Sequence, residues 1–238
     1  MKKALKVLLT SVGSNTSVCV IKGLKRQTDF DVFIVGTDTN KKENIAGSYF
    51  CDAFYTVPPA ADTKNYVDSL LKIIKLESID LLIPINNIEL EAISQNRVKI
   101  EKSTYLLLSP NETISICNDK LKMYEFFSQY NIPTPKTCAL ENIGNLNEII
   151  DSGISFPFIA KPRKGIASKD VYVIRDKEDY FSIVRKIENP VVQEKVEGQE
   201  YDIDVFCDGE KMISAVPRKR IETRAGISIK AKLKKIRN

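Results

Sequence analysis

Short apolar runs alternate with segments of helical periodicity through the first half of the chain, and this alternation limits the fold more than any other feature. The strand-like runs are residues 5–12, 32–36 and 79–85. Residues 14–25 and 66–76 lie between them and carry apolar side chains at helical spacing. Repeated β-α-β units of this kind predict a parallel sheet with right-handed crossovers. We therefore expect an α/β domain over residues 1–110.

The turn after the first strand could belong to a dinucleotide site, because Asp38 ends the second strand where such a site needs an acidic residue. A dinucleotide turn requires three glycines in the pattern G-x-G-x-x-G, which let the backbone approach a pyrophosphate. Residues 12–18 contain one glycine, Gly13. An ordinary turn between strand and helix is therefore the favoured interpretation.

A second domain is predicted from residue 111 onward, where the pattern changes. Asn118 or Asp119 can cap a helix that runs to Tyr130, and the sequence NIPTP ends it. Four strand-like segments follow, at residues 157–161, 170–175, 191–196 and 200–207. The sequence CDGE at the end of the last segment predicts a hairpin turn. An α+β arrangement is expected here.

Composition excludes several classes of chemistry. The chain has no histidine, which excludes Ser-His-Asp catalysis and histidine-ligated metal sites. Its five cysteines are scattered without a C-x-x-C pair, so we expect a reducing cytoplasm. The opening apolar run is too short to span a membrane. Residues 218–238 hold nine Lys or Arg against one Glu, so the positive charge is concentrated at the C-terminus.

Two lysines of the second domain are candidates for binding an anion. Lys120 lies in the first turn of the predicted helix, where the helix dipole disfavours a cation unless an anion is bound nearby. Lys161 ends an apolar strand, which suits a fixed charge on a phosphate. The basic loop 162–169 could close over phosphates as a lid. A solvated lysine and an exposed hairpin loop are the alternatives.

Carboxylates alternate with apolar residues in the segment EYDIDV, so Glu200, Asp202 and Asp204 share one face of a strand. A solvated sheet edge would explain this pattern. A nucleotide site would also explain it, together with Glu194 at the end of the preceding strand. In that case the backbone near Glu194 would meet the adenine edge, and a carboxylate would accept hydrogen bonds from the ribose hydroxyls.

The order of these segments resembles the ATP-grasp superfamily, in particular carbamoyl-phosphate synthase large subunits and related carboxylate–amine ligases. The segments that carry the resemblance are CNDK, IPTP, FIAKP, the small-residue loop, VVQEKVEG and EYDIDV. The first half resembles the domain that precedes ATP-grasp in such proteins. The resemblance implies a Rossmann-like pre-ATP-grasp domain over residues 1–110 and an incomplete ATP-grasp domain over residues 111–238. Residues 118–190 would form its small lid subdomain.

The same resemblance implies ATP and Mg²⁺ as cofactors, and small carboxylate and amine molecules as substrates. A carboxylate would be activated as an acyl phosphate and attacked by an amine or ammonia. The implied nucleotide contacts are Lys120, Lys161, Lys164, Gly165, Ala167, Ser168, Glu194, Lys195, Val196 and Glu200. The candidate substrate contacts, which are the candidate catalytic residues, are Arg218, Arg220 and Arg224.

Magnesium ligands are the main departure from the family pattern. Relatives carry an acidic residue on one late strand and a Glu-x-Asn on the next, and no acidic-x-Asn follows Asp204 here. We therefore expect no metal ligand in this chain, and a truncated or split ligase with little activity alone. A complementing C-terminal chain or a homodimer could complete it. The basic tail would then be a strand without its partners, or non-native sequence after a premature stop.

A non-catalytic binding protein is the rival interpretation. Its C-terminal tail would contact nucleic acid or another polyanion. The cations concerned are Lys230, Lys232, Lys234, Lys235 and Arg237. No aromatic residues are interleaved with them, which argues against RNA recognition by stacking.

Overall fold

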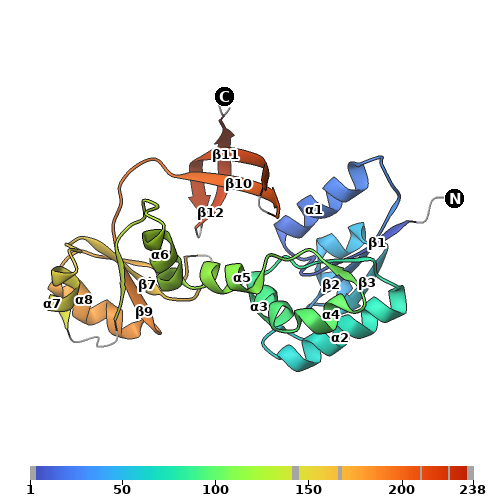
Figure 1. The fold of residues 1–238 in the computed structure, drawn as a ribbon, viewed down its shortest axis with the longest axis horizontal. Coiled ribbons are helices and arrows are strands. Elements are labelled where there is room, and N and C mark those ends of the chain that lie inside the picture. The colour runs from blue at the N-terminus through green and yellow to red at the C-terminus, as the bar shows by residue number, and fades with distance from the viewer. Residues whose placement is uncertain (1–3, 141–144, 166–167, 210, 225, 235–238) are drawn as a thin grey trace. The chain divides into compact units, whose positions relative to one another are not determined.

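The computed structural model describes residues 4–140, 145–165, 168–209, 211–224 and 226–234. Its backbone contacts divide the chain into two compact units, Met1–Ser115 (unit 1) and Ile116–Asn238 (unit 2). Each unit is described by itself below, with the elements labelled as in Figure 1. Within the described residues, no helix combines the length and apolar character needed to cross a bilayer.

Unit 1 is built on a five-stranded sheet, and all its pairings are parallel. Its strands are β1 (Leu5–Leu9), β2 (Val32–Asp38), β3 (Ala53–Thr56), β4 (Leu81–Ile83) and β5 (Tyr105–Leu106), in the order β3-β2-β1-β4-β5. The helices are α1 (Asn15–Arg26), α2 (Thr63–Glu77), α3 (Asn87–Gln95), α4 (Arg97–Glu101) and α5 (Asn111–Cys117), the last crossing into unit 2. The predicted α/β fold with a parallel sheet is confirmed.

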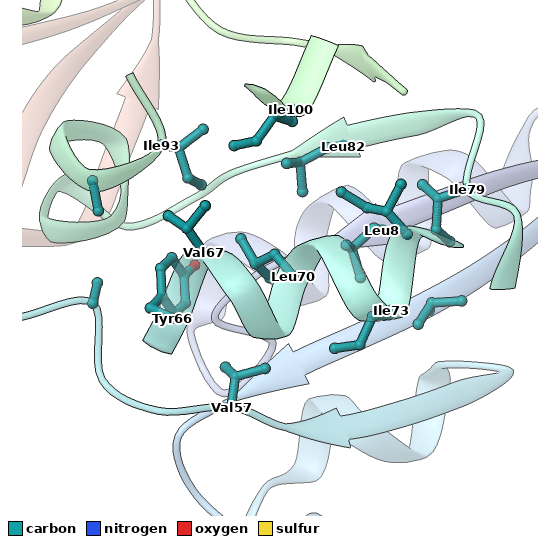
Figure 2. Packing of buried hydrophobic residues seen from close by; sticks show 14 residues of the cluster. Leu8, Val57, Tyr66, Val67, Leu70, Ile73, Ile79, Leu82, Ile93 and Ile100 are labelled. Carbon is teal, nitrogen blue, oxygen red and sulfur yellow. The ribbon is translucent and has the colours of Figure 1, made fainter. Parts of the chain in front are cut away.

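Different helices cover the two faces of this sheet. Leu8, Val35 and Leu82 pack on one face against a cluster that includes Tyr66 and Leu70 of α2 (Figure 2). The neighbouring residues Leu9 and Ile34 point to the other face and pack with Ile21 of α1. Figure 1 shows α1 and α2 on opposite sides of the strands. Burial on both faces explains why the strands read as continuous apolar runs.

Sequence periodicity missed several short elements of unit 1. Two 3₁₀ turns, Lys42–Asn44 and Ala46–Phe50, lead into the unpredicted strand β3. Helix α3 begins with a capping box. The side chain of the N-cap residue Asn86 accepts a hydrogen bond from the backbone of the N3 residue Glu89, and the Glu89 side chain accepts one from the Asn86 backbone N–H. Glu89 is buried, and this acidic residue at the N3 position was the signal that could have located α3.

Unit 2 contains a four-stranded antiparallel sheet in the order β6-β9-β7-β8. Its strands are β6 (Thr137–Ala139), β7 (Phe158–Pro162), β8 (Tyr172–Ile174) and β9 (Pro190–Glu194). The helices of this unit are α6 (Lys120–Gln129), α7 (Leu146–Asp151) and α8 (Lys177–Ile183), and α8 continues into a 3₁₀ turn at Val184–Lys186.

Alternation along these strands separates a core face from a polar face. Phe158, Ala160 and Val192 are fully buried against a cluster that includes residues of α7 and α8. Lys161 and Gln193 therefore point to the opposite face, since successive side chains of a strand alternate. The polar face of the four-stranded sheet carries the candidate site.

A separate three-stranded sheet contains β10 (Tyr201–Asp208), β11 (Lys211–Arg224) and β12 (Ile227–Leu233). The predicted turn between β10 and β11 is confirmed, and Gly209 adopts a positive φ of 58° there. The expectation that the basic tail is a strand without partners is wrong for residues 227–233. This segment pairs with β11 in antiparallel register, from Arg224 opposite Ile227 to Arg218 opposite Leu233.

Candidate functional site

Lys120 and Lys161 come together in unit 2, although 40 residues of sequence separate them. Lys120 is the first residue of α6 and Lys161 lies on β7. Both line a pocket of about 260 Å³. The remaining lining residues are Pro162, Gly165, Ser168, Lys169 and Val171. Within the described part of the chain, this lining contains three lysines and no carboxylate.

Two of the three pocket lysines, Lys120 and Lys161, are electrostatically strained. Burial, together with the smaller effect of the Lys120 charge, lowers the pKa of Lys161 from 10.5 to about 8. Burial also lowers the pKa of Lys120, although Asp119 opposes this shift. Both shifts mean that the charged ammonium is disfavoured in the pocket as it stands. A bound polyanion would remove this penalty, so the pocket is suited to phosphate groups.

Asp119 fixes the start of α6 to the base of the loop after β7. Its carboxylate accepts hydrogen bonds from the backbone N–H groups of Leu121 and Lys122, which makes it the helix cap. The same carboxylate accepts the Arg163 Nε–H, with 2.8 Å to each oxygen. The Lys120 N–H donates to the Arg163 carbonyl at 3.1 Å. Arg163 therefore anchors the base of the basic loop 162–169 to the start of α6.

The loop after Arg163 continues along the pocket wall. The Lys120 ammonium lies 3.3 Å from the Gly165 carbonyl oxygen, and Ser168 has a positive φ of 53°. Lys164 lines a neighbouring pocket of about 420 Å³ together with Gly165 and Asp170. Ala167, predicted as a nucleotide contact, lies outside the described residues.

The residues predicted along the adenine edge lie at and after the end of β9. The Glu194 N–H donates to the Lys136 carbonyl, and the Lys136 N–H donates back to the Glu194 carboxylate at 3.3 Å. Lys195 forms an ion pair with Glu197. Val196 is 67% exposed, which leaves an apolar surface free beside the strand end.

Arginines of β11 pair with the carboxylates at the start of β10, although Glu200 and Asp204 remain exposed. Arg220 contacts Glu200 at 3.1 Å and Asp202 at 3.8 Å. Arg218 donates from Nη2 to Asp204 at 2.9 Å. Arg224, the third candidate substrate contact, lies at the end of β11. None of the four predicted residues Glu200, Arg218, Arg220 and Arg224 is among the described residues that line the Lys120–Lys161 pocket.

Gln193 is a site residue that sequence reasoning missed. Its side-chain carbonyl accepts from the Lys161 ammonium at 2.6 Å, and its amide NH₂ donates to the Thr137 hydroxyl at 2.8 Å. The signal was a single polar residue inside the apolar run of β9. It identifies a position on the polar face, but the partner on β7 is visible only in the folded sheet.

In unit 1, the turn after β1 is bonded to the side chain of Asp38, the last residue of β2. The Gly13 N–H donates to one oxygen of Asp38, and the Asn40 backbone and side-chain N–H groups donate to the other. A Cβ atom at position 13 would lie 2.9 Å from the Asp38 carboxylate. Both carboxylate oxygens of Asp38 thus accept hydrogen bonds from the protein itself, in agreement with an ordinary βα turn.

Magnesium has no candidate ligand set in the described part of the chain. No group of three or more Cys, Asp or Glu side chains is arranged there to hold a metal ion. The nearest approximation, the acidic row of β10, is engaged by Arg218 and Arg220. The described carboxylates therefore do not fit a magnesium site.

Comparison with curated proteins gives partial matches. A D-alanine–D-alanine ligase of Petrotoga mobilis is 32% identical over 43% of this chain and 33% of its own length. The carbamoyl phosphate synthase large chain of Clostridium acetobutylicum is 26% identical over 62% of this chain and 14% of its own length. The chain thus spans a third or less of these two relatives.

Solved structures share the fold of nearly the whole chain. N5-carboxyaminoimidazole synthetase from Staphylococcus aureus, complexed with ADP, has a TM-score of 0.71 at 13% identity. It matches 95% of this chain and 57% of that protein. The biotin carboxylase domain of Hydrogenobacter thermophilus 2-oxoglutarate carboxylase, in complex with MgADP, has a TM-score of 0.71 at 16% identity. It matches 94% of this chain and 51% of that one.

Two family models confirm the resemblance inferred from the sequence motifs. The model described as "PylC-like, N-terminal domain" matches residues 7–107. The model described as "ATP-grasp domain" matches residues 117–236, which include the Lys120–Lys161 pocket. Since this second match extends over half of the chain, the protein belongs to the ATP-grasp family.

Proposed function

We propose that unit 2 binds ATP with its phosphates in the Lys120–Lys161 pocket and takes part in ligating a carboxylate to an amine. The observation that carries this proposal is the convergence of two partly buried ammonium groups without a carboxylate in the described pocket lining. A ligand with several negative charges would stabilise the charged forms of both ammonium groups. Membership of the ATP-grasp family supports ATP as that ligand.

The proposed reaction is phosphoryl transfer followed by acyl transfer. A carboxylate oxygen of the substrate attacks the γ-phosphorus, and the bond from that phosphorus to the ADP oxygen breaks. An amine or ammonia then attacks the acyl carbon of the acyl phosphate and displaces inorganic phosphate. The contribution of Lys120 and Lys161 is electrostatic, because fixed cations stabilise charge on the transferring group. No step is assigned to a metal ligand of this chain.

The remaining contacts of the proposal follow from the positions of the other predicted residues. Backbone groups of residues 194–196 would meet the adenine edge beside the apolar Val196 side chain. Glu200 would accept hydrogen bonds from ribose hydroxyls, which requires it to exchange Arg220 for the nucleotide. Arg218 already donates a hydrogen bond to the Asp204 carboxylate. A substrate carboxylate would compete with Asp204 for the Arg218 guanidinium.

Calorimetric titration with ATP tests the proposal, using Lys161→Met and a matched control, Lys186→Met. Lys186 is exposed in the 3₁₀ turn after α8, so its replacement removes one positive charge outside the pocket. We expect wild type and the control to bind ATP alike. Lys161→Met should bind at least about tenfold more weakly, because a hydrogen bond to a charged group contributes about 1.5–3 kcal/mol.

Two results would contradict the proposal. One is the absence of ATP binding by the wild-type chain, and the other is equal affinity in wild type and Lys161→Met. If ATP binds as expected, ADP release measured across a panel of carboxylates with an amine present identifies the substrate class.

A further inference from the structure

We propose that Gln193 is a positioning residue of the ATP site, which aims the Lys161 ammonium at the pocket while leaving its charge free for phosphate. This inference rests on the proposed ATP binding and adds to it a determinant of selectivity for anions. It is carried by a chain of hydrogen bonds that crosses three adjacent strands of the four-stranded sheet.

Thr137, Gln193 and Lys161 are placed side by side by strand pairing. Gln193 of the central strand β9 is in register with Thr137 on β6 and with Ile159 on β7. Lys161 is two residues beyond Ile159 and therefore lies on the same face. The three polar side chains thus sit on paired strands rather than on loops, so their spacing is set by the sheet.

The direction of each hydrogen bond fixes the orientation of the Gln193 amide. The Thr137 hydroxyl is buried and donates to the Pro135 carbonyl at 3.0 Å. Its oxygen is therefore available as an acceptor for the Gln193 NH₂ group. The Gln193 carbonyl must then face Lys161, where it accepts from the ammonium at 2.6 Å. If the amide were reversed, the Gln193 NH₂ group would face the Lys161 ammonium. Both groups are donors, so no hydrogen bond could form between them.

A neutral acceptor holds the ammonium without cancelling its charge. Glutamate has nearly the same shape as glutamine, but at position 193 it would form an ion pair with Lys161 and compete with the phosphates. The other charged residues in the described lining of the pocket are Lys120 from α6 and Lys169 from the loop after β7, both cations. The amide therefore keeps all the charge of the described pocket lining positive.

The test compares Gln193→Glu and Gln193→Met with the control Gln129→Glu in the full chain. Gln129 is exposed at the end of α6, so its replacement adds the same charge outside the site. Calorimetry measures the affinity of each protein for ATP and for adenosine. We expect Gln193→Glu to weaken ATP binding roughly tenfold or more while adenosine affinity stays within about twofold. Gln193→Met should weaken ATP binding less, because it removes the acceptor but adds no charge.

A second readout does not depend on nucleotide. The pKa of Lys161, followed by NMR in the free protein, should be higher in Gln193→Glu than in wild type, because a carboxylate beside the ammonium stabilises its charged form. A merely structural role of Gln193 would leave this pKa unchanged.

The inference is overturned if the wild type binds ATP and Gln193→Glu binds it equally well. It is also overturned if ATP and adenosine affinities fall by the same factor, or if the Lys161 pKa is the same in both proteins. Failure of the wild type to bind ATP would instead refute the proposed function, and the NMR titration would still report whether Gln193 controls Lys161.

Discussion

At the residue scale, the partly buried charge of Lys161 lowers the free energy of unfolding of the unliganded protein. Its pKa is about 8 in the folded chain, below the ordinary value of 10.5. Between these two pH values the unfolded state binds more protons than the folded state, so stability rises with pH across this range. Below pH 8 both states carry the charge, and the folded state bears the full cost of burying it.

Lys161→Met should therefore stabilise the unliganded protein at pH 7. We expect a gain of roughly 1–3 kcal/mol, reduced by the loss of the Gln193 hydrogen bond. The gain should shrink as pH rises from 8 and disappear near 10.5. Urea unfolding followed through the amide exchange of β7 and β9 measures this, with Lys186→Met as the control for charge. A variant less stable than wild type at pH 7 would show that the ammonium is not strained.

Asp119 links two elements, because one carboxylate caps α6 and also holds the base of the loop after β7. Burial raises the pKa of Asp119, but hydrogen bonds from Arg163 and from the Lys122 N–H lower it, and the net shift is downward. A carboxyl group with a lowered pKa stabilises the fold at neutral pH, and this stabilisation is lost as pH falls through the folded-state pKa.

Replacement of Asp119 separates its two roles. Asp119→Ala should destabilise unit 2 by about 2–4 kcal/mol at pH 7, since it removes a helix cap and a charged hydrogen bond. Asp119→Asn should cost less, because asparagine also caps helices. Both differences from wild type should decrease in acid below the ordinary pKa of aspartate. Hydrogen exchange at the first-turn amides of α6 measures the effect, and equal protection in wild type and Asp119→Ala would contradict the assignment.

The molecule as a whole consists of two units with separate cores. One core contains Leu70 of α2 and the other contains Phe158 of β7, and each cluster draws its residues from a single unit. Damage to one core should therefore stay within its own unit.

Leu70→Ala and Phe158→Ala test this independence. Both side chains are fully buried, and such truncations cost about 2–5 kcal/mol. Leu70→Ala should accelerate amide exchange in unit 1 alone and leave ATP affinity near the wild-type value. Phe158→Ala should accelerate exchange in unit 2 and weaken ATP binding, because β7 carries Lys161. Loss of protection across both units in either variant would show that they unfold together.

The sequence by itself determined the features that depend on local order along the chain. Apolar periodicity located the main strands and helices, such as β2 and α2, because the spacing of apolar residues within a segment shows which of its faces is buried. The ordered motifs predicted the family, and Lys120 and Lys161 as members of one site, although the site itself remains a proposal. Strands β3 and β12 were not predicted as paired strands, since the strands they pair with are identified only in the folded sheet.

Only the tertiary structure decided which side chains meet. Nothing near Asp119 in sequence indicates Arg163, and nothing near Lys161 indicates Gln193, because strand pairing and the approach of α6 create both contacts. The carboxylates of β10 looked free in sequence, but they face Arg218 and Arg220 across the hairpin. A local pattern gives the face on which a side chain lies, whereas its partner depends on the register between segments distant in the chain.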